Sequence, residues 1–404
     1  MIHASKVKPR HFAINGDCDD AEIDRAQSIE PTITTNKQEI NEIGNPDLVG
    51  SPAQAPTIGY RLTQLEYGSM EYWKKLANKA DAVETLTLDD FTTSTFDICA
   101  YLTDDNGTFK GTDLYPNLRT SGFSITIGNP DAIIERGFDF VGEAAIEYQG
   151  DNKYYIYVRH DAESAADDTV ILSARPPAID PDLSDYMKRI VRVRSGVSVE
   201  LEADEYTYTN GTNTLVIADV EAGDIFKIWY TSAIAPATQF TPNTSDPAAI
   251  FANSVDIYLY VPGSGKPSSE DYLYRLQSVT LDISLTRSDQ KEIGNDKIVQ
   301  RGVDDKIVKV TLGSRLESAT IQEVLRGVAP GYGKLDVSKF TDQAVLIVKI
   351  YSDETKTSFK YGFKATGLAL AESRIPVTVK TYANTESTLE GKNLTITEDV
   401  DELV

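Results

Sequence analysis

The sequence predicts a mainly β protein: two copies of one β-sandwich or barrel domain, each with a short α-helix, and a small all-β domain inserted between them. The main observation is a repeat. The segment QSIEPTITTNKQEINEIGN (27–45) recurs without a gap as QSVTLDISLTRSDQKEIGN (277–295), and seven of the nineteen positions are identical. Self-similarity over this length indicates a structural unit that occurs twice. The 21 tyrosines also favour a β fold, because tyrosine suits half-buried strands.

Each copy is expected to contain the same series of elements, so that copy one spans 1–150 and copy two spans 250–404. In chain order these are an alternating segment (6–14 and 254–261), the repeated strand, a second strand (57–65 and 305–316), a short helix (69–80 and 320–327), a buried strand (96–102 and 344–351) and a long hairpin (118–142 and 363–391). In the hairpins we align Gly122 with Gly367, Phe123 with Leu368 and Ile125 with Leu370.

The two predicted helices have ordinary structural signatures. Met70, Trp73 and Leu76 share one face of the first helix, as expected for an amphipathic helix that packs on a core. In the second helix, Thr320 and Glu323 have the spacing of a capping box, and Gly327 suits the left-handed position that ends a helix.

The material between the copies predicts a separate β domain over 165–235. Seven apolar residues in 190–231 have the spacing of short strands: Tyr206, Tyr208, Leu215, Ile217, Ile225, Ile228 and Tyr230. Asn210-Gly211 is typical of a two-residue hairpin turn. The flanking segments 161–185 and 232–249 are rich in Ala, Asp or Pro, and we expect them to be linkers.

Charge and composition exclude several classes of function. The formal net charge of −23 argues against a protein that grips DNA or RNA, although it does not argue against one that lets nucleic acid slide past. The two cysteines, Cys18 and Cys99, are expected to be free thiols, since neither has metal-ligand spacing. The N-terminal segment lacks the apolar region of a signal peptide, and no apolar run is long enough to span a membrane.

The sequence offers no catalytic constellation, so we expect no enzyme activity, no cofactor and no metal site. GSGKPSS (263–269) has Tyr260 and Pro267 where a phosphate-binding loop needs Gly and Ser or Thr. The acidic loop 104–113 lacks calcium-ligand spacing. His3, His11 and His160 are isolated from each other and from any candidate nucleophile.

The repeated strands separate into two faces, because side chains alternate along a strand. Val279, Leu281, Ile283 and Leu285 alternate with small polar residues, and the same split occurs in copy one and in the hairpin. The polar positions are Ser28, Glu30, Thr32, Thr34, Ser278, Thr280, Asp282, Ser284, Ser124 and Thr126. An ordinary solvated sheet face would give this pattern. So would the wall of a water-filled channel, whose hydroxyls and carboxylates, without Arg or Lys, would not hold phosphates.

The order of these elements resembles the tail tube proteins of long-tailed (siphovirus-type) bacteriophages, in particular the kind with two fused tube domains. The resemblance rests on the repeated strand-plus-loop and on LRTSGFSITIGNPDAIIERGFDFVGE (118–143). It implies a structural virion protein that forms trimeric, pseudo-sixfold rings, stacked into a hollow tube through which DNA passes to the host. The inserted domain would then be an external decoration.

The resemblance also implies roles, partners and a location. The ten polar positions named above would line the lumen, and the loops after each EIGN would reach the next ring: Pro46, Asp47, Leu48, Val49, Asp296, Lys297, Ile298 and Val299. Partners would be further copies of the chain, tail-tip and tail-terminator proteins, the tape measure protein and passing double-stranded DNA that is not bound specifically, with no membrane. The protein would be made in a bacterial cytoplasm and would end in the virion tail. Pro31 departs from the pattern and implies a bulge or a sheet edge.

Two other classes of function stay open. A multi-domain β adhesin or receptor-binding virion protein would need an exposed aromatic platform for sugars. The chain has only Trp73 and Trp229, and both lie in patterns typical of a core. An enzyme with an unrecognised site is the remaining alternative.

Overall fold

The computed structural model describes residues 11–13, 25–34, 57–77, 79–103, 109–142, 154–172, 187–194, 197–209, 212–232, 247–262, 276–291, 298–315, 343–374 and 384–403. The described chain is mainly β, with one large antiparallel sheet, two small sheets and little helix, which confirms the predicted fold class. Its contacts divide it into two units: 1–23, 95–118 and 144–245 form one, and 24–94, 119–143 and 246–404 form the other.

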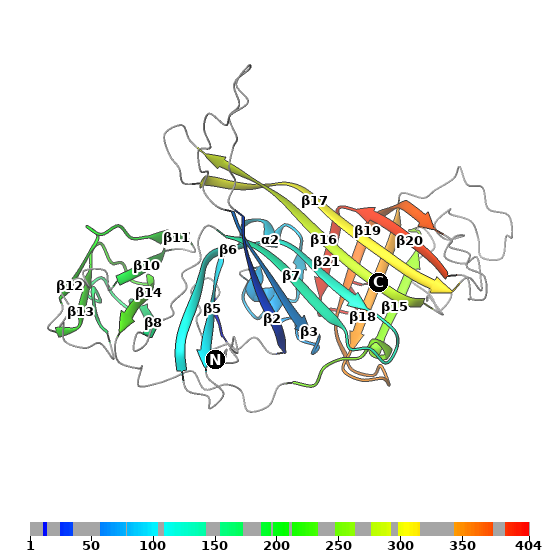
Figure 1. Ribbon diagram of the computed structural model, residues 1–404, viewed down its shortest axis with the longest axis horizontal. Helices are drawn as coiled ribbons and strands as arrows, with labels where there is room; N and C mark the ends of the chain where they lie inside the picture. The colour runs from blue at the N-terminus through cyan, green and yellow to red at the C-terminus, as the bar shows by residue number, and fades with distance from the viewer. Residues whose placement is uncertain are drawn as a thin grey trace, which may run out of the picture. The chain divides into compact units, whose positions relative to one another are not determined.

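The repeated segments form the same strands in the same hydrogen-bonded order (Figure 1). Copy one contains β1 (His11–Ala13), β2 (Ala26–Thr34), β3 (Thr57–Leu65), β5 (Phe96–Thr103), β6 (Phe109–Ile127) and β7 (Glu135–Gly142). Copy two contains β15 (Val255–Tyr260), β16 (Leu276–Lys291), β17 (Ile298–Arg315), β18 (Ala344–Tyr351), β19 (Phe359–Arg374) and β20 (Asn384–Gly391). The orders are β1-β5-β6-β7-β3-β2 and β15-β18-β19-β20-β17-β16. The strand-for-strand match supports the inference that one unit was duplicated.

The two copies also share their irregularities. A register shift lies between Ala26 and Ser28 in β2, and its counterpart lies between Leu276 and Ser278 in β16. The shift between Thr120 and Gly122 in β6 corresponds to that between Leu370 and Glu372 in β19. These matched bulges place each β6 residue 250 positions before its β19 counterpart, because 372 minus 122 is 250.

This register corrects the alignment of the hairpins. Gly122 corresponds to Glu372 and not to Gly367, and the pairings of Phe123 with Leu368 and Ile125 with Leu370 are likewise wrong by five positions. Apolar residues recur along both strands, so the sequences can be aligned in several ways. The ladders and bulges allow only one.

Among the described strands, the longer of the two strand pairs that join the copies within the chain is that of β16 with β6. Residues 279–284 of β16 pair with residues 122–127 of β6, with Asp282 opposite Ser124 and Ser284 opposite Gly122. A Cβ atom at Gly122 would lie 2.6 Å from the carbonyl oxygen of Ile283, so the two backbones approach closely at this junction. β2 ends the sheet order, and among the described strands it pairs only with β3. Its ladder continues through Pro31, so the edge position expected for that proline is confirmed, whereas a bulge at that residue is not found.

The apolar face of the sheet in the larger unit is covered by α1 (Glu71–Leu76) and α2 (Asp90–Thr93). Met70, Trp73 and Leu76 are buried, which confirms the amphipathic helix. The Trp73 ring lies 4.9 Å from the rings of both Phe123 and Phe138, with edge-to-face geometry. β4 (Thr85–Thr87) pairs with β21 (Asn393–Thr397), which in turn pairs with β19. The predicted helix at 320–327, with Thr320, Glu323 and Gly327, lies outside the described residues.

A buried polar network connects the two copies. The Arg136 side chain on β7 and the Glu66 carboxylate are fully buried, and Arg136 Nε lies 3.3 Å from Glu66 Oε2. The Tyr361 hydroxyl of β19 donates to the same carboxylate, and Glu66 Oε1 accepts the backbone N–H groups of Tyr67 and Gly68. Burial and the Glu66 charge raise the pKa of Tyr361 well above its usual value, so the phenol remains a donor.

The smaller unit contains the inserted strands: β8 (Tyr154–Asp161), β9 (Thr169–Ile171), β10 (Met187–Arg194), β11 (Val197–Glu200), β12 (Tyr206–Thr209), β13 (Thr214–Ile217) and β14 (Ile225–Ser232). They form a four-stranded sheet, β11-β10-β14-β8, and a three-stranded sheet, β12-β13-β9. Leu215, Ile217, Phe226, Ile228 and Tyr230 are buried together, with Tyr206 and Tyr208 packed against them.

Two expectations about this unit are wrong in detail. β9 lies inside 161–185, which was expected to be a linker, because Val170 fills a place in the core between the sheets. The β12–β13 hairpin exists, but Thr209 is opposite Thr214, so four residues connect the strands where Asn210-Gly211 predicted two. Asn210 and Gly211 themselves lie outside the described residues.

Candidate assembly surface

One face of the large sheet is polar, and the strands that present it are β2, β3, β7, β6, β16, β17 and β20. In β16, Val279, Leu281, Ile283 and Leu285 are buried. The residues between them face the other way: Asp282 and Ser284 are exposed, and Ser278 and Thr280 are half-buried. Ser124 is half-buried and Thr126 is exposed on β6, directly opposite Asp282 and Thr280. The predicted separation of faces is therefore confirmed for β16 and β6.

The first copy presents the same positions at the edge of the sheet. Ser28 is half-buried, whereas Glu30 and Thr32 are exposed. Thr34 is the last residue of β2, and its side chain lies outside the described set. Ile29, the counterpart of buried Val279, is only half-buried, so the apolar face of β2 is less well covered than that of β16.

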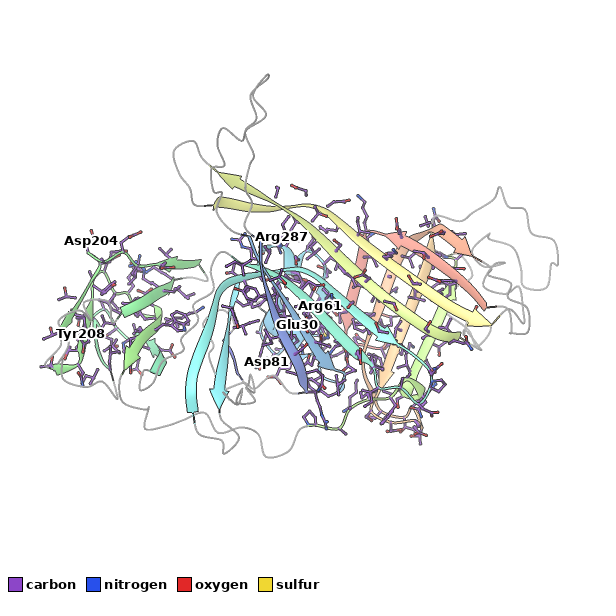
Figure 2. The ribbon with its side chains drawn as sticks, in the orientation of Figure 1. Glu30, Arg61, Asp81, Asp204, Tyr208 and Arg287 are labelled. Atoms are coloured by element: carbon purple, nitrogen blue, oxygen red, sulfur yellow. The ribbon has the colours of Figure 1, made fainter. Side chains whose placement is uncertain are left out.

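Opposite charges lie across neighbouring strands on the polar face. Glu30 is opposite Arg61, and Arg61 is opposite Asp139, with 3.3 Å between Arg61 Nη1 and Asp139 Oδ1. Figure 2 shows Glu30 and Arg61 on adjacent strands. In the second copy, Asp282 is opposite Lys309, and Lys309 is opposite Glu390. Such cross-strand pairs stabilise a sheet, whereas like charges would destabilise it.

These pairs correct the expectation that the face has no Arg or Lys. β2 and β16 supply hydroxyls and carboxylates, but β3 and β17 place one cation beside each carboxylate. Sequence reasoning missed Arg61 and Lys309 because it considered single strands, and the partner of a residue depends on pairing. These two sets of cross-strand pairs contain four carboxylates (Glu30, Asp139, Asp282 and Glu390) and two cations (Arg61 and Lys309), so their net charge is negative.

The pKa of Asp139 is affected by this crowding of negative charge. Burial raises the pKa of its carboxyl above the usual value, Arg61 opposes the rise, and the nearby charge of Asp282 adds to it. Asp282 belongs to copy two and Asp139 to copy one, and the β16–β6 junction lies between them. The polar face is therefore electrostatically continuous across the junction.

A two-stranded arm extends beyond this face. The ladder between β16 and β17 continues to Lys291 and Ile298, although pairing of β16 with β6 ends at Ser284 and pairing of β17 with β20 ends at Val308. Residues 285–291 and 298–307 thus form an arm with no third strand among the described strands, visible in Figure 1 as the far end of the β16–β17 ribbon.

Two side chains fix the base of the arm. The Arg287 guanidinium donates to the carbonyl oxygens of Thr120 (2.7 Å), Thr92 (3.0 Å) and Phe91 (2.9 Å), and thereby connects β16 to β6 and α2. Figure 2 places Arg287 at this point. Lys306 on β17 forms an ion pair with Asp89, just before α2.

The arm contains part of the predicted stacking loops. Ile298 and Val299 lie in β17 rather than in a loop, because the ladder with β16 extends further than the sequence pattern indicated. Asp296 and Lys297 lie outside the described residues. So do Pro46, Asp47, Leu48 and Val49.

Other candidate features belong to the interior or are not found in the described part of the chain. Trp73 and Trp229 are fully buried, so neither can form an exposed sugar platform. Among the described residues, no three His, Cys, Asp or Glu side chains gather as metal ligands would. Within that same set, no helix has the length and apolar character needed to cross a membrane.

Of the comparisons with known proteins, the one with solved structures gives a match. No protein-family model matches the chain, and no curated protein matches it. Among solved structures, a chain from the cryo-EM structure of the anti-feeding prophage baseplate, symmetrised six-fold, is similar over 39% of this chain and 100% of that chain, with 12% identity and a TM-score of 0.27. A TM-score of this size does not establish a shared fold.

Proposed function

We propose that the protein is a structural subunit of a phage-type tail, a double-domain tail tube protein that assembles with copies of itself into stacked rings around a bore for DNA. The observation that supports this proposal is the in-chain junction of β16 with β6, which joins two equivalent units edge to edge. If the two equivalent units of one chain pair edge to edge, the same kind of pairing can join one chain to further copies of itself. A heterologous contact of this kind produces a closed ring when the rotation between units closes.

The polar face is suited to line the bore. It has hydroxyls, paired charges and a small negative excess, and the whole chain has a net charge of −23. Such a wall repels phosphates weakly and does not bind them, so DNA can slide past. Ser28, Glu30, Thr32, Ser278, Thr280, Asp282, Ser284, Ser124 and Thr126 are the lumen-facing positions in this proposal. The β16–β17 arm would reach the adjacent ring.

Electron microscopy of the purified chain, dilute and concentrated, together with native mass, tests the proposal. Hollow rings of three chains that stack on concentration are the expected result. Added tail-tip complexes should initiate polymerisation if the chain alone remains monomeric. A monomer that does not polymerise even on tail-tip complexes would contradict the proposal and favour the adhesin alternative.

A further inference from the structure

The strand β18 is buried on both of its sides. Val348 lies opposite Phe363 of β19, whose ring is 5.8 Å from that of Trp73, so this side faces the core that α1 covers. The residues that alternate with Val348 face the other side, away from α1. There a second and smaller apolar cluster, which we call the outer cluster, contains Tyr260, Val345, Ile347 and Leu403, with Tyr258 and Phe359 packed against it. Among these residues Leu403 alone lies outside a strand, so it covers the others from outside the sheet.

Leu403 belongs to a short segment that crosses the surface of the sheet, residues 398–403, which we call the strap. The strap follows β21 directly. Val400 is 40% exposed, and Asp401 and Glu402 are exposed as well, whereas Leu403 is fully buried. The strap therefore has one apolar anchor, and the three residues before this anchor contact solvent.

The anchor fits a slot that a glycine leaves open. A Cβ atom at Gly362 of β19 would overlap with Leu403 Cδ1, so Leu403 packs directly on the backbone of this strand. Only glycine permits so close an approach. Two residues along the same strand, the Lys364 ammonium donates to the carbonyl oxygen of Glu402 (2.9 Å) and fixes the backbone just before the anchor.

The strap also contacts copy one. The backbone N–H of Glu398 donates to the carbonyl oxygen of Glu84 (2.9 Å). The Glu398 carboxylate forms an ion pair with Lys74 of α1 (2.6 Å), and the Lys74 side chain is only 6% exposed. The Thr85 hydroxyl donates to the Glu402 carboxylate. The strap, which belongs to copy two, thus holds these residues of copy one against the sheet that carries the outer cluster.

We infer that the strap opens and closes as a unit over the outer cluster, with Leu403 as its anchor, and that closing it fastens Lys74 and Thr85 of copy one to copy two. A segment held by few buried apolar contacts opens locally, without unfolding of the core. Lys74 keeps a partner when the strap opens, because its ammonium also donates to the carbonyl oxygen of Asp81 (2.9 Å). Opening exposes the outer cluster to water, so the closed strap is the favoured state. This inference does not depend on the proposed tube function.

Hydrogen exchange of the full chain, followed amide by amide, tests the strap. We expect Leu403→Asp to speed exchange of the Glu398 amide by roughly 10- to 100-fold, since burial of a leucine side chain shifts an equilibrium by about this factor. Cleavage after Glu398 by a glutamate-specific protease, located by mass, should rise in parallel, because it follows the population of the open form. The protected amides of 279–284 at the β16–β6 junction should keep their protection.

Val400→Asp is the matched control, because it places the same side chain at an exposed position of the strap. Leu403→Met should keep the strap closed, since methionine is apolar and of similar volume. Equal acceleration in Val400→Asp would overturn the inference, because the effect would then come from the added charge. An unchanged Glu398 amide in Leu403→Asp would also overturn it, since Leu403 would not be the anchor. Loss of protection at the β16–β6 junction, or failure of Leu403→Asp to fold, would show that Leu403 belongs to the main core and that no separate strap exists.

Discussion

At the scale of single residues, the buried Glu66 carboxylate connects the two copies. It faces Arg136 in copy one and accepts the Tyr361 hydroxyl of copy two. We expect Glu66→Ala to lower the free energy of unfolding by about 3–5 kcal/mol, because it leaves the Arg136 charge buried without its partner. Urea denaturation followed by tryptophan fluorescence measures this loss, since Trp73 lies in the same core.

Glu71→Ala is the matched control for this prediction. Glu71 pairs with Lys75 one helical turn later, but 57% of its side chain is exposed. An exposed pair of this kind contributes about 0.3–0.5 kcal/mol. Equal destabilisation by the two variants would show that the buried network is not what holds the copies together. Partial recovery in Glu66→Met/Arg136→Met would support the assignment, because a buried pair can be replaced by apolar side chains of similar volume.

At the scale of elements, the β16–β6 junction depends on a glycine. A Cβ atom at residue 122 would meet the carbonyl oxygen of Ile283 at 2.6 Å, and backbone cannot move aside as a flexible side chain can. We expect Gly122→Ala to destabilise the larger unit by about 1–3 kcal/mol. Hydrogen exchange should locate the loss in the amides of residues 279–284 and 122–127.

A second strand glycine provides the control for that variant. At Gly59 the nearest atoms lie 3.9 Å from an added Cβ, so Gly59→Ala should change stability by no more than about 1 kcal/mol in either direction. If both variants were equally well tolerated, close approach at the junction would not be what fixes its register.

The elements also show how far the sequence could predict this fold. Most strands of both copies, the α1 face and the two sides of β16 follow from periodicity in short windows, which is local information. β4 and β21 were not predicted, and β6 begins at Phe109, inside the segment 104–113 that was expected to be a loop. The predicted sequence alignment of β19 with its counterpart β6 was wrong by five positions. The bulges that fix this alignment arise from the pairing of β19 with β20 and of β6 with β7. Arg61 and Lys309 were missed for the same reason. The three-carbonyl contact of Arg287 was not predicted, since it depends on residues more than 160 positions away along the chain.

At the scale of the whole molecule, the proposed bore depends on the sign of the charge that DNA meets. Replacing Glu30 and Asp282 with Lys would reverse that sign, but each new lysine would also lie opposite a cation, Arg61 or Lys309. Like charges directly opposite destabilise a sheet, so slower DNA passage in these variants could reflect a damaged wall. Thr280→Lys avoids this problem, because Thr280 lies opposite Thr126 and Thr311, which are uncharged.

We therefore expect Thr280→Lys to slow DNA ejection from virions without loss of tube assembly, since a ring of lysines would contact the phosphates that pass it. The delay should shrink as salt is raised, because phosphate contacts release counterions and weaken with ionic strength. Asp204→Lys is the control. It replaces an exposed acidic residue among the inserted strands of the smaller unit with a lysine, and it should leave ejection unchanged. Equal ejection rates for Thr280→Lys, Asp204→Lys and the unaltered chain at low salt would place the polar face outside the bore. A salt-sensitive delay confined to Thr280→Lys would place this face along the path of the DNA, because only a lysine that meets the phosphates can slow them.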